Sequence, residues 1–276
     1  MVLRKGDKND FVKQLQQKLG VDAGAGAGTF GPKTEDALKA WQKANGLTAD
    51  GIAGPATLSK LGIVITEAAK PAATAPKATT GNLYSKDVIE KAVTAKGYKW
   101  FADKDLMLNI VGVRNSATGN AVTNLFDDRI TVSYLEGGEW KYFEWVNTTD
   151  PGKKGVKEYH NAAGVARLVE GQYIGSHTLG LHQGKYEALK QAKPVKVFRD
   201  ANRDMTYDEN KIAEGVFGIN IHKAGADSTY VENWSEGCQV FKKAADFEAF
   251  MAICRKAAAV HGKSFTYTLI ESADIK

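Results

Sequence analysis

Apolar residues recur at helical spacing within the first sixty positions of the chain. The two sets are Val12, Leu15 and Leu19, and Ala37, Leu38 and Trp41. A glycine-rich stretch separates the sets, and Pro32 is well placed to begin the second helix. A third short helix fits residues 55–61. The pattern therefore predicts a small three-helix bundle over residues 1–63.

From residue 83 onward, short apolar and β-branched runs bounded by turn residues are typical of strands. The runs fall at 106–113, 129–135, 140–146, 164–169, 195–199, 216–222 and 265–270. Residues 136–139 form a hairpin signal between two of them. Helices are predicted over 88–93, 186–191 and 244–260. Many strands and few helices predict a β-rich, partly barrel-like or sandwich core, so the fold class is α+β with more than one domain.

Residues 64–82 differ in composition from both neighbours. Alanine, threonine, lysine and proline dominate, and there is no aromatic residue. Such a stretch is typical of a solvated, fairly extended linker. The predicted domains are therefore residues 1–63 and 83–276, joined by this tether.

Composition and charge narrow the functional classes. Of the 276 residues, 43% are hydrophobic and 25% are charged, and the net charge of +5 is spread along the chain. A diffuse positive charge suits an anionic polymer such as a cell wall, but it does not favour nucleic acid. No stretch approaches eighteen uninterrupted apolar residues, so we expect no membrane insertion.

Two cysteines, Cys238 and Cys254, are too few for a disulfide framework. Cys254 lies in a helical pattern and is expected to be a small buried hydrophobic residue. Cys238 follows a glycine in a short polar turn, sixteen residues after His222, which ends an apolar, β-branched run. A histidine near a cysteine is the usual means of activating a thiol nucleophile. Gly237 leaves backbone N–H groups of the turn free to form an oxyanion hole.

This segment resembles the catalytic domains of L,D-transpeptidases, in which an apolar strand ends in histidine and a Ser-His-Gly-Cys turn follows. The matching residues are His222, Ser235, Gly237 and Cys238. Glu236 stands where that family usually has its second histidine, and Gln239 stands where an arginine usually follows the cysteine. The resemblance implies a predominantly β catalytic domain, with Cys238 as nucleophile and His222 as general base.

The first sixty residues closely resemble a three-helix peptidoglycan-binding module. The matching segments are Leu15-Gln16, residues 28–34, Trp41-Gln42, Gly46-Leu47 and residues 50–54. The resemblance implies bacterial peptidoglycan as the partner. The loops at residues 28–31 and 50–54 are the expected wall contacts, because exposed loops on a rigid scaffold carry recognition.

Residues around Cys238 are candidates for substrate contacts. Glu236 is either a solvated turn residue or a partner for a cationic group such as the amine of a stem peptide. Ser235 either closes the turn or positions substrate. Trp234 is a candidate pocket wall, and Gln239 a further contact.

His177 and His182 lie five residues apart among glycines and are also expected near the substrate. A zinc site on these histidines is an alternative, since wall peptidases use such ligands. The chain has no His-Glu-x-x-His motif, and we expect no metal and no cofactor.

The combined interpretation is a peptidoglycan-degrading cysteine peptidase, similar to phage endolysins, acting as a monomer. The N-terminus has no apolar signal segment, which suggests synthesis in a host cytoplasm before action on the wall or periplasm. Two alternatives remain: a bacterial L,D-transpeptidase that forms cross-links, and a non-catalytic wall-binding structural protein.

Overall fold

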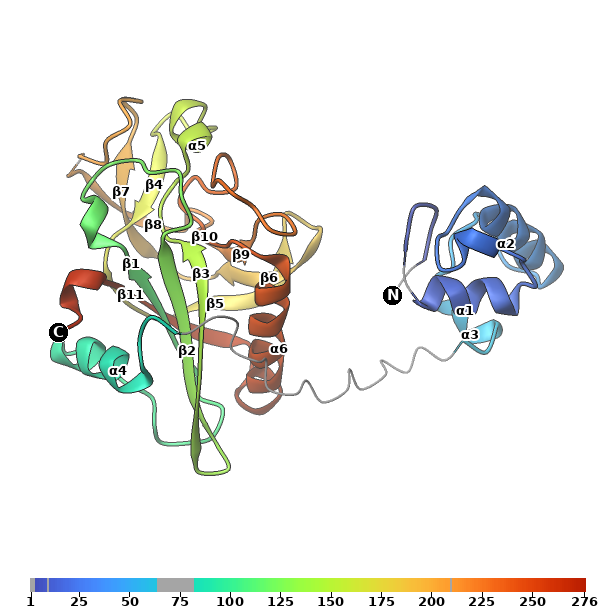
Figure 1. The fold of residues 1–276 in the computed structure, drawn as a ribbon, viewed down its shortest axis with the longest axis horizontal. Helices are drawn as coiled ribbons and strands as arrows, with labels where there is room; N and C mark the ends of the chain where they lie inside the picture. Colours follow the sequence, from blue (N-terminus) through green and yellow to red (C-terminus); the bar gives the residue numbers. More distant parts are fainter. Residues whose placement is uncertain (1–2, 9, 64–81, 209) are drawn as a thin grey trace. The chain divides into compact units, whose positions relative to one another are not determined.

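The structure is a computed structural model that describes residues 3–8, 10–63, 82–208 and 210–276 (Figure 1). The chain divides into two compact units, residues 1–76 and 77–276. The predicted linker, apart from Asn82, lies outside the described residues.

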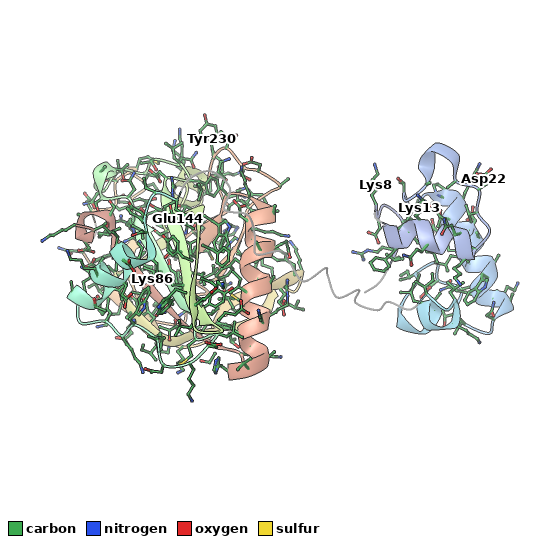
Figure 2. The ribbon with its side chains drawn as sticks, turned by 60° about the horizontal axis from the view of Figure 1, so that its bottom comes forward. Lys8, Lys13, Asp22, Lys86, Glu144 and Tyr230 are labelled. Carbon is green, nitrogen blue, oxygen red and sulfur yellow. The ribbon has the colours of Figure 1, made fainter. Side chains whose placement is uncertain are left out.

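The N-terminal unit has helices at the three expected positions. Its elements are α1 (Asp10–Lys18), the 3-10 helix η1 (Gly24–Gly26), α2 (Pro32–Ala44) and α3 (Pro55–Lys60). Leu15, Phe30 and Leu38 are at most 1% exposed and form the centre of its core. The surface is polar, as Lys8, Lys13 and Asp22 show (Figure 2).

Two glutamines hold the loops of this unit. The side-chain oxygen of Gln16 accepts from the backbone N–H of Gly28 at 2.8 Å, and that of Gln42 accepts from Gly51 at 2.9 Å. Each side-chain amide also donates to a carbonyl of the same loop at 2.9 Å. The two loops expected to contact the wall are therefore fixed by hydrogen bonds from two buried glutamines of the helices.

The second unit is built mainly from strands. They are β1 (Asn109–Arg114), β2 (Asp128–Glu136), β3 (Glu139–Thr148), β4 (Val165–Leu168), β5 (Gly171–His182), β6 (Tyr186–Gln191), β7 (Val195–Asp200), β8 (Ile212–Gly215), β9 (Ile221–Lys223), β10 (Gln239–Phe241) and β11 (Ser264–Glu271). A closed barrel runs in the order β1-β11-β5-β6-β9-β10-β3-β2, and β4-β7-β8 form a separate sheet. The barrel is mixed, because β1 pairs in parallel with β11 and β9 with β10.

Helices and short turns complete the unit. They are α4 (Lys86–Ala95), η2 (Ser116–Thr118), α5 (Lys153–Lys157), α6 (Ala244–His261) and η3 (Ser272–Asp274). α6 packs on β9 and β10, and α4 packs on β11 (Figure 1). The inner face of α6 carries Phe247, Phe250 and Cys254, each 0% exposed. Cys254 is thus a buried core residue, as expected from the helical pattern.

Leu83 and Tyr84, near the start of this unit, are bound to β3. Glu144 accepts from the backbone N–H groups of Leu83 and Tyr84 at 3.1 and 3.0 Å, and it pairs with Arg129 of β2 at 3.2 Å. Figure 2 shows Glu144 and, at the start of α4, Lys86. None of the helices that the structure describes has the length and apolar character needed to cross a bilayer.

Two predicted elements were wrong. Residues 186–191 were expected to be helical, but they form β6, which pairs with β5 as a hairpin. The turn between them has positive φ at both Gln183 and Gly184, which suits a hairpin. Residues 216–220 were expected to be a strand, but β9 begins only at Ile221. Gly218, at φ +79°, interrupts the extended run.

Candidate active site

A cavity of about 750 Å³ opens in the second unit beside the β5–β6 hairpin, β9 and the turn before β10. Its lining consists of His160, His182, Gln183, Lys185, Tyr186, His222, Asn233, Trp234, Glu236 and Cys238. Five residues singled out from the sequence therefore come together here: His182, His222, Trp234, Glu236 and Cys238. The chain has only five histidines, and three of them line this cavity.

His222 and Cys238 are brought together by two neighbouring parallel strands. Val240 of β10 lies opposite His222 of β9, so Cys238 stands two residues before the partner of His222. The Gln239 N–H donates to the Asn220 carbonyl at 2.9 Å and anchors the end of the turn. Pairing of strands distant in sequence thus places a thiol and an imidazole in one cavity.

The ring of His222 is oriented by the backbone. Its Nδ1 lies 2.9 Å from the Lys223 carbonyl, and the Tyr186 hydroxyl donates to the same oxygen at 3.3 Å. A carbonyl can only accept, so Nδ1 carries the hydrogen and Nε2 is left as the acceptor. Burial and then the neighbouring His182 lower the pKa of His222 to about 4, against the smaller opposing effect of the Lys223 carbonyl. The imidazole is neutral near pH 7.

His182 and His177 have different environments because they lie an odd number of residues apart on β5. His182 stacks on His222 with ring centroids 4.1 Å apart. His177 is 1% exposed, its Nε2 lies 2.9 Å from the Ile219 carbonyl, and burial lowers its pKa to about 4. His177 is not among the residues that line the cavity, and its side chain supports the backbone ahead of β9. Its expected contact with substrate stays a prediction.

The tautomer of His182 follows from Asn220. The Asn220 side-chain oxygen accepts from the Gln191 N–H at 2.9 Å, which leaves its amide hydrogens to face Nδ1 of His182 at 3.2 Å. Nδ1 of His182 is therefore the acceptor, and Nε2 carries the hydrogen. Nε2 of His182 can therefore donate a hydrogen bond, whereas Nε2 of His222 can accept a proton.

Ser235 and Gly237 shape the turn that presents Cys238. The Ser235 hydroxyl donates to the Cys238 carbonyl at 2.8 Å and accepts from the Gly237 N–H at 3.1 Å. Gly237 has φ +141°, and a Cβ there would lie 2.1 Å from the carbonyl oxygen of Ala166 in β4. A glycine is required because the turn passes so close to β4.

These contacts bear on two of the sequence predictions. Ser235 is 0% exposed and closes the turn, which is one of the two roles expected of it. The Gly237 N–H donates to Ser235, whereas the Cys238 N–H has no acceptor among the residues that the structure describes.

Gln239 has a structural role. It is 0% exposed, accepts from the Tyr267 hydroxyl at 2.7 Å, and donates to the Gly237 carbonyl at 3.2 Å. The side chain of Gln239 lies among buried groups, where it holds the backbone of the turn before β10. Its expected contact with substrate stays a prediction.

The thiol of Cys238 is protonated at rest. It donates to the Gly218 carbonyl at 3.3 Å. Burial raises the pKa of Cys238 to about 11, and the charge of Glu236 adds to the effect although the Asn220 backbone N–H opposes it. Together with the low pKa of His222, this means that both groups are uncharged near pH 7, so the resting site holds a thiol and not a thiolate.

Glu236 does not stand free, because it binds His160. Nδ1 of His160 lies 2.5 Å from one carboxylate oxygen, and the His160 N–H donates to the other at 3.2 Å. The side chain of His160 is 89% exposed and that of Glu236 is 29% exposed. Sequence reasoning missed His160, since it lies in an irregular loop after α5. The scarcity of histidine in the chain was the only signal.

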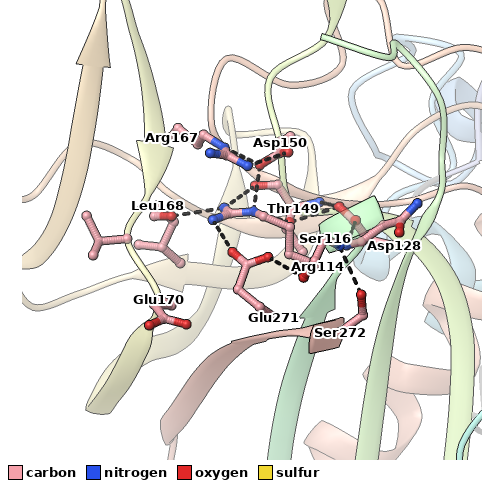
Figure 3. Close-up of polar contacts among 12 residues, drawn as sticks. Arg114, Ser116, Asp128, Thr149, Asp150, Arg167, Leu168, Glu170, Glu271 and Ser272 are labelled. Carbon is pink, nitrogen blue, oxygen red and sulfur yellow. Dashed lines mark hydrogen bonds and ion pairs between the residues drawn. The ribbon is translucent and has the colours of Figure 1, made fainter. Parts of the chain in front are cut away.

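A buried network of charges lies behind the turn (Figure 3). Arg114, which is 2% exposed, pairs with Asp150 at 2.8 Å and with Glu271 at 3.4 Å. Arg167 pairs with Asp150 at 2.9 Å. Burial and then the charge of Asp150 raise the pKa of Asp128 to about 7. Burial alone would raise the pKa of Asp150, but the two arginines more than offset it and lower that pKa.

The network reaches the turn that carries Cys238 through residues 149–152. Asp128 accepts from the backbone N–H of Thr149 at 2.6 Å, and the Gly152 N–H donates to the Ser235 carbonyl at 2.9 Å. A Cβ on Gly152 would lie 2.2 Å from the Glu232 carbonyl oxygen. The segment therefore packs directly on the turn and connects it to the buried ion pairs.

Among the described residues, no group of three or more His, Cys, Asp or Glu side chains is placed to hold a metal ion. Within the described residues, His177 and His182 therefore have no third side chain of these types placed to complete a zinc site.

Comparison with known proteins identifies the N-terminal region. Residues 8–61 match the family described as putative peptidoglycan binding domain, which confirms the predicted binding module. The chain is also 45% identical over 64 residues to a zinc D-Ala-D-Ala carboxypeptidase of Streptomyces albus G. That match covers 21% of this chain and 25% of the relative, so the chain spans about a quarter of that protein.

Solved structures also show similarity. An endolysin of Burkholderia phage AP3 is 29% identical over 34% of this chain and 32% of its own, with a TM-score of 0.21. An L,D-transpeptidase of Xylanimonas cellulosilytica is 15% identical over 98% of both chains, with a TM-score of 0.25. Both likenesses are weak at these TM-scores.

Proposed function

We propose that this protein is a peptidoglycan-degrading cysteine peptidase that cleaves stem peptides through an acyl-enzyme on Cys238. The observation that carries the proposal is the pairing, in one cavity, of a thiol with an imidazole whose Nδ1 is held by the Lys223 carbonyl. That hydrogen bond leaves Nε2 of His222 able to take a proton. The match of residues 8–61 to a peptidoglycan-binding family supports peptidoglycan as the partner.

The protonation states define the first step. The thiol and the imidazole are both neutral at rest, so proton transfer accompanies the attack. Sγ attacks the peptide carbonyl carbon while the thiol proton, which is hydrogen-bonded to the Gly218 carbonyl at rest, transfers to Nε2 of His222. The C–S bond forms, and the carbonyl oxygen becomes an oxyanion. His222 then gives the proton to the leaving amine as the C–N bond breaks.

Deacylation repeats the sequence with water. His222 takes a proton from water as the hydroxyl adds to the thioester carbonyl, and the thiol leaves with that proton. The Cys238 N–H is the proposed oxyanion donor, and the N–H on Nε2 of His182 is a proposed contact for substrate. Trp234, 43% exposed, provides a wall of the cavity.

The binding unit supports catalysis by anchoring. A domain that binds the same polymer raises the local concentration of stem peptides around the second unit. Loss of the binding unit should therefore affect action on whole cell walls more than action on small soluble peptides.

Mass spectrometry of purified peptidoglycan and defined muropeptides tests the function. The wild type is expected to release shortened or un-cross-linked peptides, and Cys238→Ala is expected to release none, because the nucleophile is absent. Cys254→Ala is the matched control, since that thiol is fully buried in α6 and should keep its products.

Other products identify the alternatives. New cross-links or exchanged terminal amino acids would make the protein an L,D-transpeptidase. Activity that survives Cys238→Ala and disappears with a chelator would establish a metal peptidase. The absence of products from every form of the protein would leave a wall-binding protein without this activity.

The pH dependence of thiol alkylation tests the neutral resting state. With a pKa of about 11, Cys238 is expected to react with iodoacetamide about tenfold faster for each unit of pH between 6 and 9.5, because only the thiolate reacts. Peptide mapping separates Cys238 from Cys254. A plateau below pH 8 would show a stabilised thiolate and contradict the concerted first step.

A further inference from the structure

We propose that Glu236 and His160 form a subsite for a primary ammonium group of the substrate. This inference rests on the proposed function and extends it to a substrate class: stem peptides that carry a free amine. An incoming ammonium would replace the imidazole of His160 on the Glu236 carboxylate.

The carboxylate of Glu236 supports this assignment, because the one lysine of the cavity lining, Lys185, donates to Gln183 at 3.4 Å. Glu236 is the only acidic residue among the ten that line it, and the site of attack, Cys238, lies two residues along the same turn. The carboxylate is partly exposed, so a ligand can reach it without a change in the fold. An ammonium offers three donors to such an acceptor, and a charge-assisted hydrogen bond is stronger than a neutral one.

His160 occupies the carboxylate in a way that a ligand can reverse. Both of its hydrogen bonds within the described chain go to Glu236, and its side chain is 89% exposed. Displacing it therefore breaks no packing in the core. The imidazole acts as an internal competitor that satisfies the carboxylate when no substrate is bound.

Trp234 suits an ammonium group that is carried on an alkyl chain. The indole is 43% exposed and lies in the same turn and the same cavity wall. A flat aromatic surface beside a carboxylate suits methylene groups that end in a cation. A free amine on a diamino acid side chain has this chemistry.

Binding at this subsite would also act on the nucleophile. The negative charge of Glu236 contributes to the raised pKa of the Cys238 thiol, after burial. A bound ammonium neutralises that charge and so favours proton transfer from the thiol to His222. The same group would therefore select the substrate and assist the attack.

Small thiol reagents test the subsite without any requirement for peptidase activity. Ethyl methanethiosulfonates that carry a primary ammonium or a sulfonate group are compared by their rates of modification of Cys238. Glu236→Gln is expected to lower the cation-to-anion rate ratio about tenfold, and His160→Ala is expected to raise it, because the competitor is removed. Glu158→Gln is the control: it makes the same charge change at a residue outside the cavity lining, and should keep the wild-type ratio.

Two peptides then test the substrate class. They are stem peptides of one sequence, with the side-chain amine either free or acetylated. The wild type is expected to cleave the free-amine peptide with about tenfold higher kcat/KM, and Glu236→Gln is expected to bring the two values together.

The outcomes separate this inference from the proposed function. If Glu236→Gln leaves the reagent ratio unchanged, or His160→Ala lowers it, the subsite is refuted even when both peptides are cleaved. If the ratio responds as expected and neither peptide is cleaved, the subsite stands and the peptidase function fails. Equal cleavage of the two peptides by the wild type refutes the substrate class.

Discussion

Replacing His222 by alanine or glutamine is expected to lower kcat/KM on stem peptides by about 10³-fold or more. With a thiol pKa of about 11, only about one molecule in 10⁴ holds a thiolate at pH 7 when no base assists. His222 removes this limitation because the Lys223 carbonyl leaves Nε2 free to take the proton as the C–S bond forms. Steady-state kinetics on a defined muropeptide measures the loss.

Glutamine is the informative replacement, because it retains polarity and bulk at this buried position but cannot take a proton. His222→Gln should lose as much activity as His222→Ala and should remain folded. His261→Gln is the matched control, since that histidine is exposed on α6 and bonds only the Asp105 carbonyl within the described chain. Retention of more than a tenth of the activity by His222→Gln would exclude His222 as the base.

Replacing Arg114 by alanine is expected to lower the free energy of unfolding of the second unit by about 3–5 kcal/mol. The guanidinium is 2% exposed and lies between Asp150 and Glu271, with Asp128 close by (Figure 3). Its removal leaves buried carboxylates with only Arg167 to compensate Asp150. Denaturant unfolding of the full chain measures the change.

The pH dependence separates lost charge from lost packing. Without Arg114, the carboxylates would have pKa values above the value of about 4 in an unfolded chain, as Asp128 already has at about 7. A folded state that holds protons more tightly is favoured at low pH, so the destabilisation should grow from pH 5 to pH 8. Lys141→Ala, which breaks an exposed ion pair with Glu139, should have no measurable effect. An equal loss at both pH values would show that lost packing dominates.

Much of the fold could be predicted because local patterns and tertiary contacts agree there. The run 129–146 alternates around a Glu-Gly-Gly-Glu turn, and it forms β2 and β3 paired along their whole length. The helix at 244–260 matches α6 within one residue. In both segments, apolar residues at the correct period become the buried face.

Local preference failed where a neighbouring strand decided the structure. Residues 186–191 contain good helix formers, yet they form β6 because β5 offers an unpaired edge across the Gln183-Gly184 turn. On β5 of the same hairpin, His182 and His177 lie five residues apart and so point to opposite faces of the strand. The identity of the residues gave no means of telling which histidine would face the cavity, because the strand itself had not been predicted.

The sequence by itself determined the candidate chemistry: a cysteine after a glycine in a polar turn, a histidine at the end of an apolar run, and a binding module with several ordered motifs. These are local properties of residue type and spacing. Only the tertiary structure decided that Ser235 and Gln239 support the turn, that the Lys223 carbonyl orients His222, and that His160 reaches Glu236. Each of these depends on the approach of segments that strand pairing and close packing bring together, and no local pattern records such contacts.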